Sequence, residues 1–72
     1  MTEKEDNDRW IESGRKYSAL DNEAMARYFR TIAKLDGARR KRVVLAFEEA
    51  TNEGWRPKWA VKRALAAMKS GV

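Results

Sequence analysis

Residues 22–35 read NEAMARYFRTIAKL, and this stretch decides the fold class of the chain. Spaced at 100° per residue, its apolar side chains gather on one broad side of a helix. Asp21 or Asn22 can cap that helix by accepting a hydrogen bond from an early backbone N–H. We therefore predict an amphipathic helix over residues 22–35, whose opposite side carries three cations: Arg27, Arg30 and Lys34.

Three more helices are predicted, one before this helix and two after it. The first spans about Asp8 to Ser18, the third Ala38 to Asn52, and the fourth runs from the entry at residues 55–57 to Lys69. Gly37 fits the position after the second helix, where a positive φ is favoured, and Gly54 ends the third. No segment alternates with period two for long enough to form a strand. The chain is therefore predicted to be all-α, a compact bundle of three to four short helices.

The fourth helix is predicted to have one inner side. Proline is favourable at its first position because the missing N–H would be unpaired there anyway. Trp55, just before it, can pack back onto the first turn. Alanines on the inner side would let another backbone approach closely. The residues assigned to that side are Ala60, Val61, Ala64, Leu65, Ala67 and Met68.

Trp59 falls on the other side of the fourth helix, together with Lys62 and Arg63. A tryptophan on a basic helix face can stack on an exposed nucleic-acid base, or lie under Arg63 as a cation–π pair. The alternative is that Trp59 packs against Trp10 or Tyr17 of the first helix, since a small domain seldom leaves such an area exposed.

The composition excludes several catalytic and metal-binding chemistries. The 72 residues allow one domain at most and contain no Cys and no His, so thiolate catalysis, an imidazole base and His/Cys zinc sites are absent. Glu49 and Glu53 lie one turn apart, but a solvated helix end is expected there rather than a cation site. No apolar run is long enough to span a membrane, and the polar N-terminus is not a secretory signal. We expect a cytoplasmic protein that is not an enzyme and carries no cofactor or metal.

The strongest clue to function is a run of positive charge from Arg27 to Arg42. The run has a net charge of +6 with Asp36 as its one acid, in a chain whose net charge is +5. Cations held on folded elements repel one another unless a polyanion or an acidic partner relieves them. Arginines around the start of the third helix would also make that helix N-terminus an anion site. Solvated or internally paired cations are the alternative. The seven cations are Arg27, Arg30, Lys34, Arg39, Arg40, Lys41 and Arg42.

Residues 1–8 have the opposite character. They carry four acids and one lysine, a net charge of −3, and no apolar residue after Met1. We expect a disordered acidic tail over residues 1–8 and a single helical domain over residues 9–72. The tail could also lie on a basic face and compete with a polyanion, although a frayed, solubilising end is the simpler expectation.

The span from Phe29 to Glu48 resembles a helix–turn–helix motif at its small and apolar positions, which are Ile32, Ala33, Gly37, Ala38, Val43 and Ala46. It departs from the motif at Asp36, where an apolar residue is expected before the glycine. A plain helical hairpin is the alternative. The resemblance implies that one side of the third helix would face DNA, with arginine forks available to guanine edges. That side comprises Arg39, Arg40, Lys41, Val44, Leu45 and Glu48.

Two functions are compatible with these features. The first is a small regulatory or accessory protein that binds nucleic acid, DNA more than RNA, through phosphate contacts from the cations named above. The second is a protein-interaction module, a small inhibitor or adaptor that docks on an acidic partner, anchored by Trp59, Leu45 and Val44. A two-fold homodimer would double the basic surface in either case.

Overall fold

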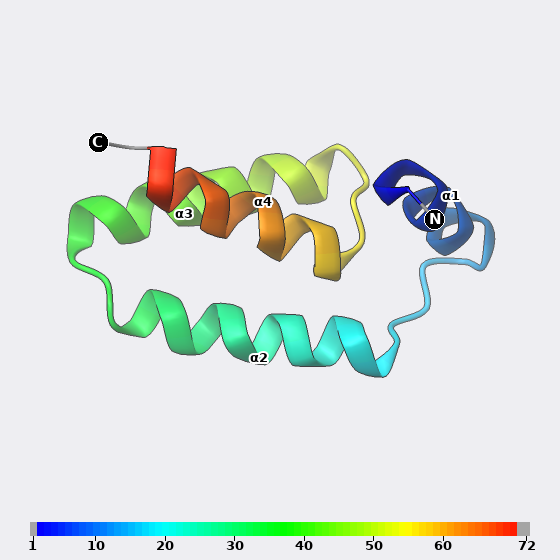
Figure 1. Ribbon diagram of the computed structural model, residues 1–72, viewed down its shortest axis with the longest axis horizontal. Coiled ribbons are helices and arrows are strands. Elements are labelled where there is room, and N and C mark those ends of the chain that lie inside the picture. Colours follow the sequence, from blue (N-terminus) through cyan, green and yellow to red (C-terminus); the bar gives the residue numbers. More distant parts are fainter. Residues whose placement is uncertain (1, 71–72) are drawn as a thin grey trace.

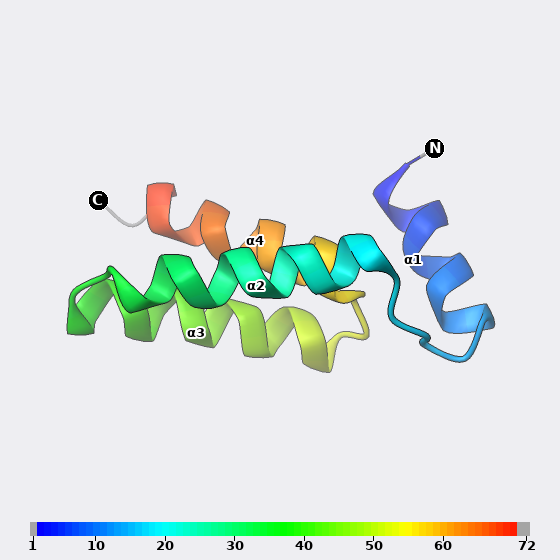
Figure 2. The same ribbon diagram turned by 90° about the horizontal axis from the view of Figure 1, so that it is seen from below.

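A computed structural model describes residues 2–70, and within them it shows four helices and no strand. They are α1 (Glu3–Glu12), α2 (Ala19–Ala33), α3 (Gly37–Asn52) and α4 (Pro57–Ser70). The all-α prediction is confirmed. The molecule is elongated, 36 × 20 × 20 Å, because α2, α3 and α4 form a bundle along one axis. Figures 1 and 2 show α1 at the end of this bundle where α2 begins and α3 connects to α4.

The start of α2 lies three residues before the predicted one, because Ser18 is its cap. The Ser18 hydroxyl accepts a hydrogen bond from the Asp21 N–H at 3.2 Å, and the Asp21 carboxylate accepts one from the Ser18 N–H at 2.9 Å. This reciprocal pair satisfies two donors that the first turn leaves without helical partners. The prediction that Asp21 or Asn22 caps the helix was therefore wrong, since both lie inside its first turn.

The connection between α2 and α3 is tighter than predicted. Asp36 caps α3 by accepting a hydrogen bond from the Arg39 N–H at 2.8 Å, so Gly37 is the first residue of α3 and does not take a positive φ. At the end of α2, the Arg40 guanidinium donates to the carbonyls of Ile32 and Leu35 at 3.0 and 2.9 Å. The Ile32 carbonyl also accepts the Leu35 N–H at 3.2 Å, so Arg40 adds a second donor there, and α2 ends at Ala33 without a left-handed glycine.

The N-terminal segment is the main correction to the predicted secondary structure. The described residues 2–8 are not a disordered tail, and the first helix spans Glu3–Glu12 rather than about residues 8–18. Thr2 caps it by accepting from the Glu5 N–H at 3.2 Å, and the acids of its first turn lie at the positive end of the helix dipole. Gly14, at φ +83°, then turns the chain toward α2.

Small residues set the spacing within the bundle. Ala50 of α3 and Ala60 and Ala64 of α4 are buried, and α3 and α4 are the pair that packs most closely. Between α2 and α3, Tyr28 and Phe47 stack with ring centroids 4.4 Å apart, and these large rings hold the two helices further from each other. The predicted inner side of α4 is confirmed, because Ala60, Val61 and Ala64 are buried and Leu65 and Met68 pack on the same core.

The span Phe29–Glu48 forms a plain helical hairpin. Residues 34–36 connect α2 to α3, and the two helices run in opposite directions along the bundle (Figures 1 and 2). A helix–turn–helix motif instead sets its two helices across each other, which presents the second one to a groove. Two predicted helix boundaries are confirmed: Gly54 follows α3 at φ +92°, and Pro57 is the first residue of α4.

Candidate functional site

The charges of the folded chain are separated along its long axis. The second half of α2, the first half of α3 and the second half of α4 lie at one end of the bundle (Figure 1). With the α2–α3 connection, they carry eight Lys and Arg and one acid, a net charge of +7, and we call this region the basic end. The other end, which includes α1, carries eight Lys and Arg and ten acids, a net charge of −2. The eight cations of the basic end are Arg27, Arg30, Lys34, Arg39, Arg40, Lys41, Arg42 and Lys69.

Folding therefore brings the seven predicted mid-chain cations to the basic end, and all seven are exposed. Arg40 also has the structural role described above, capping the end of α2. Arg39 lies 3.8 Å from Asp36, and both side chains are about two-thirds exposed, so this pair is weak and screened by water. Within residues 2–70, Arg27, Arg30, Lys34 and Lys41 form no ion pair with an acid.

The N-terminus of α3 is not the open anion site that the sequence suggested. The Asp36 carboxylate already accepts the Arg39 N–H at 2.8 Å, so a negative group of the chain itself occupies that position. The arginines of this first turn lie near the positive end of the helix dipole, where a cation is unfavourable by a few tenths of a kcal/mol. Asp36 offsets this cost locally, and the side chains of the basic end, rather than the helix terminus, are what a ligand would meet.

Trp59 has a different partner from those considered in the sequence analysis. Its indole N–H donates to the Asp6 carboxylate of α1 at 2.7 Å, and the ammonium groups of Lys58 and Lys62 lie 4.7 and 4.9 Å from its ring centroid. Trp10 pairs instead with Tyr17, with ring centroids 6.4 Å apart. The expectation that Trp59 packs on Trp10 or Tyr17 named the wrong partners, although Trp59 does contact α1.

Lys62 and Arg63 share one acid from α1. The Glu3 carboxylate lies 3.1 Å from the Lys62 ammonium and 3.2 Å from the Arg63 guanidinium. Arg63 also covers the ring of Trp55 at 3.7 Å rather than that of Trp59. The three side chains of the ion pairs are well exposed, so each pair contributes little to stability. These two cations thus lie toward the α1 end of the molecule and share Glu3 as an ion-pair partner.

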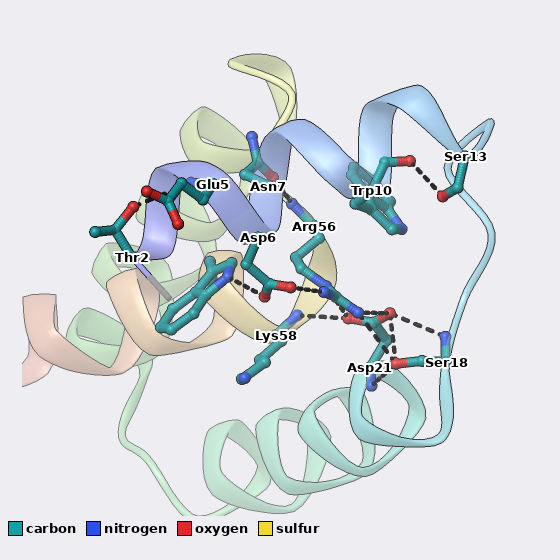
Figure 3. Close-up of polar contacts among 11 residues, drawn as sticks. Thr2, Glu5, Asp6, Asn7, Trp10, Ser13, Ser18, Asp21, Arg56 and Lys58 are labelled. Atoms are coloured by element: carbon teal, nitrogen blue, oxygen red, sulfur yellow. Dashed lines mark hydrogen bonds and ion pairs between the residues drawn. The ribbon is translucent and has the colours of Figure 1, made fainter.

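The most buried polar cluster is centred on Arg56, which the sequence analysis did not single out (Figure 3). Its side chain is 12% exposed, and the guanidinium contacts Asp6 at 2.6 Å and both oxygens of Asp21 at 3.0 Å. The Asp21 side chain is 0% exposed. The Arg56 N–H donates to the Asn7 side chain at 2.7 Å, so residues of α1, α2 and the α4 entry meet here.

The Asp21 carboxylate of this cluster accepts hydrogen bonds from Arg56, Ser18 and Lys58. Burial disfavours the charged form and raises the pKa of Asp21, but hydrogen bonds from Arg56, Ser18 and Lys58 outweigh it and lower the pKa from 3.8 to about 2. The hydrogen bond to Asp21 is the main reason that the pKa of Arg56 rises in turn. A buried carboxylate with three partners is a structural anchor, and the basic end and the α4 side chains remain the candidates for a binding site.

A groove between α2 and α4 joins three of the predicted site residues: Arg27, Trp59 and Lys62. It has a volume of about 650 Å³ and also includes Lys58 and Lys69, which the sequence analysis did not predict as site residues. The available signal was their spacing, since Lys58, Lys62 and Lys69 recur along one side of α4 at helical intervals.

In the part of the chain that the structure describes, no three Asp or Glu side chains gather as metal ligands. Across the same residues, none of the helices has the length and apolar character needed to cross a bilayer. Comparison with known proteins adds no assignment, because no family model, curated protein or solved structure matches this chain.

Proposed function

We propose that the protein binds nucleic acid through its basic end, contacting phosphates as a small regulatory or accessory factor of the cytoplasm. The observation that supports this most is the net charge of +7 at one end of a 36 Å molecule. Arginine and lysine side chains bind phosphates by ion pairing, and each phosphate contact releases counterions from the polyanion. The role proposed is one of binding and involves no catalytic step.

The direct test is a salt-dependent binding titration. Fluorescence anisotropy of a labelled DNA duplex and of a labelled single strand is measured at 50 and 200 mM salt. With six or more phosphate contacts, the affinity is expected to fall roughly a thousandfold between these concentrations. Absence of binding to both DNAs at 50 mM salt would remove the proposal.

A matched pair of triple variants locates the contacts. Lys34→Gln, Arg39→Gln and Lys41→Gln remove three exposed charges from the basic end and leave the Arg40 cap intact. Lys4→Gln, Arg9→Gln and Lys16→Gln remove three exposed charges from the α1 end. The first set is expected to reduce the slope of log K against log salt by about 0.9 per lost duplex contact, and the second to leave it nearly unchanged. Equal effects would mean that net charge, not the basic end, governs binding.

An acidic protein partner is the second candidate, supported by exposed apolar side chains on the bundle. Phe29 is 57% and Leu45 49% exposed, and such residues can anchor a protein interface beside charged groups. Of the other expected anchors, Val44 and Trp59 are half-buried. Poly-glutamate of the same length as the DNA distinguishes the two: binding as tight as that of DNA at equal salt would favour the protein partner.

A further inference from the structure

The groove between α2 and α4 combines positive charge with an apolar floor. Its cations come from both helices and no Asp or Glu lines it, while the floor includes Ala24, Val61 and Leu65. A volume of about 650 Å³ lies within the ~300–1,000 Å³ of sites that bury a small organic ligand. The groove therefore suits a ligand that has both an apolar face and negative charge. The four cations are Arg27, Lys58, Lys62 and Lys69.

Trp59 gives this groove an aromatic wall. The ring is half-buried, and its N–H is held by Asp6 at 2.7 Å, which restricts its orientation. The ammonium groups of Lys58 and Lys62 lie within 5 Å of the ring centroid and can move to a phosphate, because lysine side chains are long and flexible. An aromatic ring among cations is the combination that proteins use for single strands, since every base offers a face that stacks.

The distribution of cations along α4 favours a strand over a single nucleotide. Lys58 and Lys69 are eleven residues apart on one helix, which corresponds to roughly 16 Å at 1.5 Å per residue. Arg27 faces them from α2. Phosphates on both sides of a base held at Trp59 would therefore meet a cation.

We propose that the α2–α4 groove binds a segment of single-stranded nucleic acid, with one base stacked on Trp59 and the flanking phosphates on Arg27, Lys62 and Lys69. The proposal rests on the proposed function and specifies its ligand. A duplex keeps its bases paired and stacked, so it presents no base face to the groove without an unstacking cost. Single strands are accordingly expected to bind more tightly than duplexes of equal charge.

The test compares three labelled 12-mers by anisotropy at 50 mM salt: oligo(dT), a strand of abasic deoxyribose phosphates, and a duplex. Base stacking on an aromatic side chain is worth enough to make oligo(dT) bind about tenfold more tightly than the abasic strand. If the two bind equally, the groove proposal falls while phosphate binding stands. If none of the three binds, both proposals fall.

Two pairs of substitutions with the same charge change locate the strand. Arg27→Gln with Lys69→Gln removes two cations of the groove, and Arg30→Gln with Lys41→Gln removes two exposed cations outside it. The groove pair is expected to weaken oligo(dT) binding about tenfold more than the outer pair does, because only the groove cations contact the phosphates that flank the stacked base. Equal behaviour of the two pairs would overturn the proposal.

Two further measurements address Trp59 and a competing occupant. Trp59→Leu is expected to lower oligo(dT) affinity to that of the abasic strand, whereas Trp55→Leu, at a tryptophan outside the groove lining, is expected to preserve the difference. A Trp55→Leu variant that loses the affinity difference between the two strands, while Trp59→Leu keeps it, would contradict the assignment.

Dodecyl phosphate has a phosphate and an alkyl chain but no base. If it displaces oligo(dT) at concentrations below those of free dTMP, the groove binds an alkyl chain and the proposal is wrong.

Discussion

The contacts that hold α2, α3 and α4 together as a bundle differ in kind from the contacts that attach α1 to it. The bundle buries Tyr28, Val43, Val61 and Ala64 in one apolar cluster shared by α2, α3 and α4. In contrast, α1 contributes one buried aromatic residue, Trp10, and is connected mainly by hydrogen bonds and ion pairs. Apolar burial depends little on pH, whereas a carboxylate–guanidinium cluster depends on the charge of every member. The difference means that pH and single-charge substitutions should separate the two regions.

Removing Arg56 is expected to have the largest effect. Arg56→Met leaves the carboxylates of Asp6 and Asp21 without their shared cation, and breaking a buried ion pair typically costs about 3–5 kcal/mol. Urea denaturation, followed by circular dichroism, measures the free energy of unfolding. Arg39→Met is the control, because this arginine is 65% exposed and its loss should stay within about 0.5 kcal/mol. Similar losses for the two variants would show that the cluster does not anchor the fold.

The bundle itself is tested at Val43, which is fully buried. Val43→Ala removes two methyl groups from the core and is expected to lower the free energy of unfolding by about 2 kcal/mol. The loss should be the same at pH 6 and pH 3, since no charge is involved. Val44→Ala, at the half-buried neighbouring position, should cost clearly less. A Val43→Ala loss that changes with pH would contradict the separation of the two regions.

Acid is expected to weaken the anchor of α1 through Asp21. Its folded pKa of about 2 lies below the ordinary 3.8, so its stabilisation is present above pH 3.8 and is lost as the pH falls toward 2. The shift corresponds to at most about 2 kcal/mol. Carbon-13 NMR of the Asp21 carboxyl should give a midpoint near 2, and the Asp21→Asn variant should lose less stability over the same pH range than the unmodified protein. A midpoint near 3.8 would rule out the anchor.

The smallest effect on stability is expected at Glu3, which pairs with Lys62 and Arg63. Glu3→Gln should change the free energy of unfolding by less than about 0.5 kcal/mol, because these pairs are exposed. It should nevertheless raise the affinity for oligo(dT) two- to threefold, since Lys62 is freed for phosphate. Glu5→Gln makes the same charge change at an exposed position with no such pair. An equal gain for Glu5→Gln would mean that only net charge matters.

The features that the sequence predicted well are those decided by neighbouring residues. The inner side of α4, Pro57 at its start and Gly54 after α3 follow from helical spacing and from local backbone preferences. The N-terminal segment was mispredicted because its partners are distant in the chain. Asp6 bonds to Arg56 and Trp59, 50 and 53 residues away, and nothing within residues 1–8 indicates those partners.

The candidate site was predictable in part for the same reason. The mid-chain cations lie within 16 consecutive residues, so a single hairpin brings them to one end of the molecule. The groove depends on Arg27 of α2 lying beside Lys62 and Lys69 of α4, and these helices are separated by the whole of α3. Spacing along α4 alone cannot show which helix covers that side. The pairing of Lys62 and Arg63 with Glu3 could not be predicted either, because Glu3 lies far from both residues in the sequence.

The unequal ends of the molecule have a consequence for how it approaches a ligand. A charge of +7 at one end and −2 at the other, along a 36 Å axis, is a large electric dipole. The field of a polyanion exerts a torque on such a dipole, and steering of this kind raises the rate of association at low salt. The molecule would arrive with the α2–α3 connection leading and α1 trailing, already oriented before the first contact forms.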